Sequence, residues 1–171
     1  MLEELRRFFQ RRRDEVDAQF RRTLPLGDYV VDRWEKARML GFGEGSSVYD
    51  SAHIFGSVTV GRDCWIGPFT LLDGSGGLSI GDNCSISAGV QIYSHDTVGW
   101  AVSGGAAAPS HAPTRIGSNC YIGPNAVIAK GVDIGDGAIV GANSLVLADI
   151  PAGATAYGTP ARVVPAEGEL L

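Results

Sequence analysis

Membrane segments, cysteines and metal-binding motifs are all scarce in this chain of 171 residues, and each absence narrows the class of protein. No apolar run approaches the roughly 20 residues that cross a bilayer, and the start does not resemble a signal peptide. We therefore expect a cytoplasmic protein without stable membrane insertion. The 3 cysteines lack C-x-x-C spacing, which argues against a disulfide framework or a zinc knuckle.

Basic residues are scarce in most of the chain. Of the 14 lysines and arginines, 10 lie in residues 1–38, and the remainder carries 4 basic against 11 acidic residues. A body this acidic does not favour nucleic acid as a partner. The basic run near the start is interleaved with acidic residues, which favours a solvated helix face over an anion-binding arm.

Glycine, by contrast, is abundant at 24 residues, and a sequence repeat accounts for it. From Val48 onward an aliphatic residue returns every six positions, often followed directly by glycine, and the residue four positions later is almost always small or aliphatic. The aliphatic positions, with a two-residue insertion before Ile80, are Val48, Ile54, Val60, Ile66, Leu72, Ile80, Ile86, Ile92, Ile116, Ile122, Ile128, Ile134, Val140, Val146 and Ala152.

This period predicts an all-β fold, a parallel β-helix in which three hexapeptides close one triangular coil of 18 residues. Each coil buries its aliphatic side chains only by stacking on its neighbours. Cys64, Cys84 and Cys120 all fall in the column of small residues. We therefore interpret them as core filler and not as nucleophiles.

The segment before the repeat has a helical pattern. Apolar spacing predicts a helix over residues 2–22, ended by Leu24–Gly27, and a second helix over residues 32–40. We therefore expect a helical N-terminal segment (1–47), a β-helix domain (48–164) and a C-terminal tail (165–171).

One stretch departs from the repeat. Residues 98–115 do not supply the inward aliphatic side chains, so we expect a loop ejected from the prism just after His95. Loops mounted on a rigid scaffold often carry substrate sites, which makes Trp100 and His111 candidate acceptor contacts. An ordinary exposed position is an equal alternative for both.

His95 is the candidate catalytic base. An imidazole, with an ordinary pKa of about 6.5, is suited to take a proton from a hydroxyl or an amine near neutral pH. A lone histidine is more often structural than catalytic, but His95 stands beside a carboxylate and next to the ejected loop. We therefore predict that it acts as a general base.

Two carboxylates compete as the partner of His95. Asp96 is the only carboxylate in a column that should face the core, where it must be paired, although neighbours along a strand point in opposite directions. Counting residues per coil places Asp96 over Gly76 and Tyr93 over Asp73, about 4.8 Å apart. Asp73 is therefore a second candidate, and the sequence leaves the choice open.

The repeats, with "YSHD" around His95 and "GTPAR" near the C-terminal end, resemble the hexapeptide-repeat acyltransferases of bacteria. The similarity is closest to the sugar O-acetyltransferases of capsule and lipopolysaccharide gene clusters, relatives of the maltose and galactoside acetyltransferases, and covers roughly residues 29–164. The resemblance implies a left-handed β-helix and a homotrimer with active sites between subunits. It also implies acetyl-CoA as co-substrate, a sugar or nucleotide-sugar acceptor, His95 as general base and no metal.

The resemblance further implies which residues line the coenzyme A channel. The matching positions are Tyr121, Gly123, Pro124, Ala129, Gly141 and Ala142, and Arg162 of "GTPAR" matches a basic residue near the nucleotide phosphates. Ala148 stands where relatives commonly carry a lysine that helps to hold the 3′-phosphate. Either Lys130 substitutes for that lysine, or coenzyme A binds more weakly.

Three other functions stay open at this point. N-acetylation of a nucleotide-linked amino sugar would use the same prism and co-substrate. A γ-type carbonic anhydrase would need three histidines on one zinc ion, and His53, His95 and His111 occupy unlike positions in the repeat. A non-catalytic prism that serves as an assembly subunit would have no reason to keep a histidine and a loop where the repeat breaks.

Overall fold

The structure, a computed structural model, describes residues 1–164, and the expected C-terminal tail (165–171) lies outside the described residues. The helices span Leu2–Phe20 (α1), Leu26–Val30 (α2), Arg33–Met39 (α3) and Val98–Val102 (α4). The early strands are β1 (Ser47–Val48), β2 (His53–Val60), β3 (Trp65–Ile66), β4 (Leu71–Ile80), β5 (Ser85–Ile86), β6 (Gln91–Ile92) and β7 (His95–Asp96). The later strands are β8 (Ser110–His111), β9 (Thr114–Ile116), β10 (Tyr121–Ile122), β11 (Val127–Ile128), β12 (Asp133–Ile134), β13 (Ile139–Val140), β14 (Leu145–Val146), β15 (Thr155–Gly158) and β16 (Ala161–Val164).

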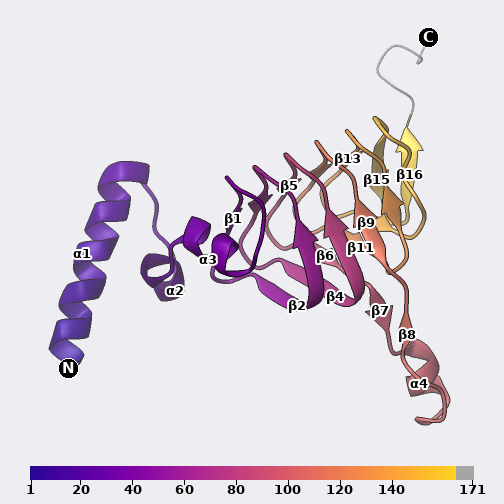
Figure 1. The fold of residues 1–171 in the computed structure, drawn as a ribbon, viewed down its shortest axis with the longest axis horizontal. Helices are drawn as coiled ribbons and strands as arrows, with labels where there is room; N and C mark the ends of the chain where they lie inside the picture. The colour runs from indigo at the N-terminus through magenta and orange to yellow at the C-terminus, as the bar shows by residue number, and fades with distance from the viewer. Residues whose placement is uncertain (165–171) are drawn as a thin grey trace.

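The strands stack into a parallel β-helix of about six turns, which confirms the predicted fold class (Figure 1). One face contains β1, β3, β5, β10, β13 and β15. The second contains the first parts of β2 and β4 with β6, β11 and β14, and the third contains their last parts with β9 and β12. Because each face repeats in register, aliphatic side chains of successive coils pack on one another: Ile66, Ile86, Ile122 and Val140 are at most 1% exposed.

The predicted phase of the repeat fails in the last coil. Ala152 is exposed, and Ile150 takes the inward position by pairing with Ile134. Ile150 follows Val146 after four positions instead of six. Because this repeat is two residues shorter, the inward position falls on Ile150 and not on Ala152, which counting in steps of six had given.

The N-terminal segment forms three helices instead of the two predicted. α3 matches the second predicted helix and begins where Asp32 caps it, because this carboxylate accepts hydrogen bonds from Trp34 N at 3.0 Å and Glu35 N at 2.9 Å. α1 ends at Phe20. The segment Leu24–Gly27, which we expected only to end the first helix, also contains the start of α2. α1 lies away from the β-helix and packs on α2 (Figure 1). Residues 1–164 contain no helix with the length and apolar character of a membrane span.

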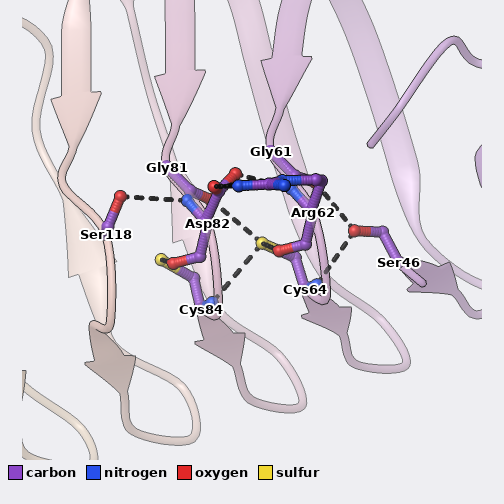
Figure 2. A network of polar contacts seen from close by, with 8 residues as sticks. All are labelled: Ser46, Gly61, Arg62, Cys64, Gly81, Asp82, Cys84 and Ser118. Carbon is purple, nitrogen blue, oxygen red and sulfur yellow. Dashed lines mark hydrogen bonds and ion pairs between the residues drawn. The ribbon is translucent and has the colours of Figure 1, made fainter. Parts of the chain in front are cut away.

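The three cysteines lie in the core, as predicted, at 2% exposure or less. They also link the coils, because Cys64 Sγ donates to Gly81 O and Cys84 Sγ donates to Gly117 O, both at 3.0 Å. Figure 2 shows the contact of Cys64 with Gly81 beside the ion pair between neighbouring coils, formed by Arg62 and Asp82. The flanking thiols of Cys120 and Cys64, together with burial, raise the pKa of Cys84. Cys84 is therefore a protonated core residue.

The chain leaves the prism at β7 and returns at β9, so the excursion begins three residues earlier than predicted. We call residues 95–113 the arm. β7 and β8 pair as antiparallel strands, and α4 lies at the far end, projecting away from the β-helix (Figure 1). Ile92 and Ile116 are 24 residues apart instead of 6, and after the arm Ile116 stacks on Ile80, so the prism continues on its third face.

Candidate active site

Asp73 lies at a bend in β4, where the repeat carries its two-residue insertion. The pairing of β2 with β4 shifts register at this bend. Gly77 adopts a φ of +96°, which favours glycine, and a Cβ on Gly76 would lie 2.3 Å from Ser94 O. The glycines of "DGSGG" therefore permit a tight bend, and the Asp73 side chain is only 2% exposed.

The Asp73 carboxylate is held by four hydrogen bonds. Ser75 N donates to Oδ1 at 2.9 Å, and Ser94 N and His95 N donate to Oδ2 at 3.0 and 3.2 Å. The fourth partner is His95 Nδ1, 2.5 Å from Oδ2. Burial alone would raise the pKa of this carboxyl, but the hydrogen bonds from Ser75, Ser94 and His95 outweigh it and hold the pKa well below the ordinary 3.8. Asp73 is therefore a buried, ionised carboxylate.

Asp73 fixes the orientation of the His95 ring. An ionised carboxylate can only accept hydrogen bonds, so Nδ1 carries the proton of the neutral imidazole. Nε2 is then left with its lone pair, which is the form that can accept a proton. The His95 side chain is 34% exposed, so substrate can reach it.

His111 lies against His95. The two residues face each other across β7 and β8, and their rings stack with centroids 5.8 Å apart and planes inclined by 24°. The arm therefore places His111 beside the candidate base, although His111 does not line the groove described below, and its role as an acceptor contact stays a prediction. Trp100 lies on α4, is 50% exposed and does not line the groove beside His95.

The prediction that Asp96 faces the core was wrong. Its side chain is 37% exposed, because the chain has already left the prism at β7. Lys130 Nζ lies 2.7 Å from Asp96 Oδ2, and Val98 N donates to Oδ1 at 3.0 Å. The hydrogen bond from Lys130, followed by that from Val98, lowers the pKa of Asp96. Of the two candidate carboxylates, Asp73 contacts the His95 ring and Asp96 pairs with a lysine.

An open groove of about 520 Å³ lies beside His95. Its walls are Tyr93, His95, Asp96, Thr97, Val98, Val127, Ala129 and Lys130. Apolar walls with a few convergent polar groups are typical of a small-molecule site. The groove therefore combines space for a ligand with an imidazole that can accept a proton.

The positions expected to line the coenzyme A channel are spread over the chain. Ala129 and Lys130 lie in the groove beside His95. Gly123 packs so closely on the next coil that a Cβ would lie 2.6 Å from Ala142 N. The remaining expected positions, Tyr121 on β10, Pro124, Gly141 and Arg162 on β16, do not line the groove.

Lys130, the candidate substitute for the lysine that is missing at Ala148, already has partners within the chain. Its Nζ pairs with Asp96 and donates to Ser110 Oγ, a pairing that our sequence reasoning missed. Counting in the repeat could have found this pairing, because Ile128 stacks directly on Ile92, which brings residue 130 close to the base of the arm.

The three histidines do not converge. His53 lies on β2 with its ring stacked on that of Phe55, 6.3 Å between centroids, whereas His95 and His111 meet at the arm. In the part of the chain that the structure describes, no three His, Cys, Asp or Glu side chains gather as a metal site requires. The zinc centre of a carbonic anhydrase is therefore not assembled from these histidines within residues 1–164.

Comparison with known families identifies the repeat. Residues 113–148 match the bacterial transferase hexapeptide (six repeats), and residues 57–94 match the hexapeptide repeat of succinyl-transferase. The chain thus carries hexapeptide repeats of the transferase type on both sides of the arm, which confirms the predicted repeat.

Curated relatives of this chain include an acetyltransferase. The 2,3,4,5-tetrahydropyridine-2,6-dicarboxylate N-acetyltransferase of Staphylococcus aureus (strain Newman) is 43% identical over 76 residues, which cover 44% of this chain and 32% of that protein. The chain therefore spans about a third of the length of the curated relatives that it matches. The relative is an N-acetyltransferase, so the O-acetyltransferase branch stays a prediction.

Solved structures share the β-helix fold. AntD, an N-acyltransferase from Bacillus cereus solved with dTDP and 3-hydroxybutyryl-CoA, superposes with a TM-score of 0.65 at 21% identity, over 80% of this chain and 90% of its own. A hexapeptide-repeat acetyltransferase from Vibrio cholerae gives a TM-score of 0.58 at 21% identity, over 95% of this chain and 92% of its own. At such identities the likeness concerns the fold.

Proposed function

We propose that this chain transfers an acetyl group from acetyl-CoA to a sugar hydroxyl, with His95 as the general base. The observation that carries the proposal is the contact between His95 Nδ1 and the buried carboxylate of Asp73, which leaves Nε2 as a proton acceptor beside the groove. The acetyltransferase relatives, and the acyl-CoA bound by AntD, support the choice of acetyl-CoA as donor.

In the proposed reaction the acceptor hydroxyl oxygen attacks the carbonyl carbon of the thioester. His95 Nε2 takes the hydroxyl proton as the new C–O bond forms, and the C–S bond breaks when the tetrahedral intermediate collapses. The imidazolium then gives its proton to the departing thiolate, so the products are an acetyl ester and coenzyme A. Asp73 stays ionised and stabilises the imidazolium. A general base of this kind contributes about 10²- to 10⁴-fold to the rate.

We further propose that the protein is a homotrimer that acts in surface polysaccharide biosynthesis. The spread of the expected channel positions supports a channel that a second subunit completes, because Ala129 and Lys130 line the groove whereas Tyr121 and Arg162 lie outside it. Cyclic symmetry would then give three equivalent sites.

N-acetylation of a nucleotide-linked amino sugar is the second candidate. It is favoured by the activity in the name of the Staphylococcus aureus relative and by a structure of an AntD variant with dTDP-4-amino-4,6-dideoxyglucose and coenzyme A. The same groove and co-substrate would serve both reactions. An acceptor that arrives as a free amine has less need of a base, so the two candidates differ in their dependence on His95.

Release of the coenzyme A thiol from acetyl-CoA tests the proposal. The acceptors are matched pairs of sugars that differ only in a hydroxyl or an amino group, offered free and nucleotide-linked. Turnover of the hydroxyl member supports O-acetylation, and turnover of the amino member alone supports the second candidate. A protein that neither turns over any acceptor nor binds acetyl-CoA would be the assembly subunit.

A further inference from the structure

Lys130 contacts both strands of the arm from a neighbouring coil of the prism. It follows β11, and its side chain is 25% exposed. Its Nζ lies 2.7 Å from Asp96 Oδ2 on β7 and donates to Ser110 Oγ on β8. Asp96 and Ser110 are themselves a facing pair across the two strands. A single ammonium group therefore ties together the base of the arm and the rigid β-helix.

The arm needs such support because it has little of its own. β7 and β8 form two residue pairs, and an isolated two-stranded hairpin is marginally stable at best. No residue of α4 is buried. Besides Lys130, the base is held by Asp73, which accepts hydrogen bonds from His95 N and His95 Nδ1, by Ala112 N donating to Ser94 O at 2.9 Å and by Thr114 Oγ1 donating to Tyr93 O at 2.7 Å. The placement of His111 against His95 thus depends on a few contacts.

The local charges favour this supporting role over phosphate binding for Lys130. Its positive charge is matched by the carboxylate of Asp96, whose pKa it lowers, and Ser110 takes a second of its three donors. A lysine reserved for a phosphate would keep its charge uncompensated. Lys130 also lines the groove that contains His95, so the arm is fastened beside the candidate base.

We propose that Lys130 is a positioning residue that fastens the arm so that His111 stays stacked on His95. The expected effect on kcat rests on the proposed acetyl transfer, whereas the expected effect on the stability of the arm does not. With the fastening lost, β7 and β8 part more often, and the wall of the groove formed by Asp96, Thr97 and Val98 loses its shape. The wall formed by Val127 and Ala129, on the rigid coils, keeps its shape.

The test compares Lys130→Ala and Lys130→Arg with Arg62→Ala. Arg62→Ala is a matched control, because this variant also removes one positive charge and one ion pair between coils, that of Arg62 with Asp82 at 2.9 Å. Arg62 lies on the early coils. Hydrogen exchange of residues 97–112 measures the arm without any substrate. Steady-state kinetics measure kcat and the KM for acetyl-CoA.

We expect Lys130→Ala to speed exchange in the arm about tenfold and to lower kcat by a similar factor, with the KM for acetyl-CoA changed by less than about twofold. Lys130→Arg should restore most of both, and Arg62→Ala should change neither. Unchanged exchange in Lys130→Ala, or a raised KM for acetyl-CoA at unchanged kcat, would overturn the inference. If the wild type transfers no acetyl group, the proposed function fails, while exchange still decides the role of Lys130.

Discussion

Replacing Asp73 by asparagine tests the orientation of His95 with the smallest change of shape. Asparagine keeps the size of the side chain but places an NH₂ group where one carboxylate oxygen was. If that nitrogen takes the Oδ2 position, it faces Ser94 N, His95 N and His95 Nδ1. His95 then relieves its own conflict by moving its proton to Nε2, and that tautomer cannot accept a proton there. If the nitrogen takes the Oδ1 position, it faces Ser75 N, and the imidazolium still loses the stabilising charge.

The two orientations give the range of the expected effect. One buried N–H left without an acceptor costs about 1–3 kcal/mol, and the two backbone donors at Oδ2 cost roughly twice that. Each kcal/mol corresponds to about 2–4 °C in Tm for a domain of this size. The catalytic loss, with either the wrong tautomer or no charge behind the ring, should be about 10²- to 10⁴-fold in kcat/KM.

Thiol release and calorimetry measure the two effects, and Asp82→Asn is the matched control. Asp82 also accepts hydrogen bonds between coils, from Arg62 N at 2.8 Å and Arg62 Nη2 at 2.9 Å, but it does not touch His95. We expect Asp82→Asn to lower Tm and leave kcat/KM unchanged. If Asp73→Asn lowers Tm but keeps kcat/KM within about threefold of the wild type, Asp73 does not orient the base and the reasoning is refuted.

Three further predictions concern pH, backbone strain and the thiols. Because the pKa of Asp73 is lower in the folded protein than the ordinary 3.8, its charge stabilises the fold fully above that pH, and the contribution is lost as the pH falls toward the folded pKa. The stability difference between wild type and Asp73→Asn should therefore shrink in acid, and a constant difference would contradict the assignment. Phe69 has a φ of +58° at a corner where Asn125 and Asn143 stand in other coils, so Phe69→Asn should raise the free energy of unfolding by about 1 kcal/mol in urea titrations. A loss of stability would contradict this prediction. The 3 buried cysteines should react with a thiol reagent only after denaturation, and inactivation of the native protein would reveal a role that the core position does not explain.

The β-helix could be predicted because its cause is periodic. An inward aliphatic residue every six positions can be buried only by stacking, so the sequence alone places Ile92 over Leu72, and the structure pairs these two residues. The same counting made Asp73 a rival to Asp96, because it brought residues 73 and 93 together. The inward residue of the last coil was predicted wrongly, because the repeat before Ile150 is two residues shorter and nothing in its residue types indicates this.

The break in the repeat predicted that a loop leaves the prism after His95, but the geometry of the arm could not be predicted, because it depends on contacts outside the repeat. Counting placed Asp96 in an inward column, but the chain had already turned outward at His95, where the antiparallel pairing with Ser110 and His111 replaces stacking. No period specifies where a chain leaves a prism. The pairing of Asp96 with Lys130 follows only from that departure.

The central claim, that His95 is the base for acetyl transfer, is tested most directly by kcat/KM for wild type and His95→Ala with acetyl-CoA and the best acceptor of the panel. The His95 side chain is 34% exposed, so the variant should fold, and an unchanged Tm and oligomeric mass would establish that it does. The account predicts a fall in kcat/KM of about 10²- to 10⁴-fold, with little change in acetyl-CoA binding. A folded His95→Ala variant that transfers acetyl groups at the wild-type rate would contradict it.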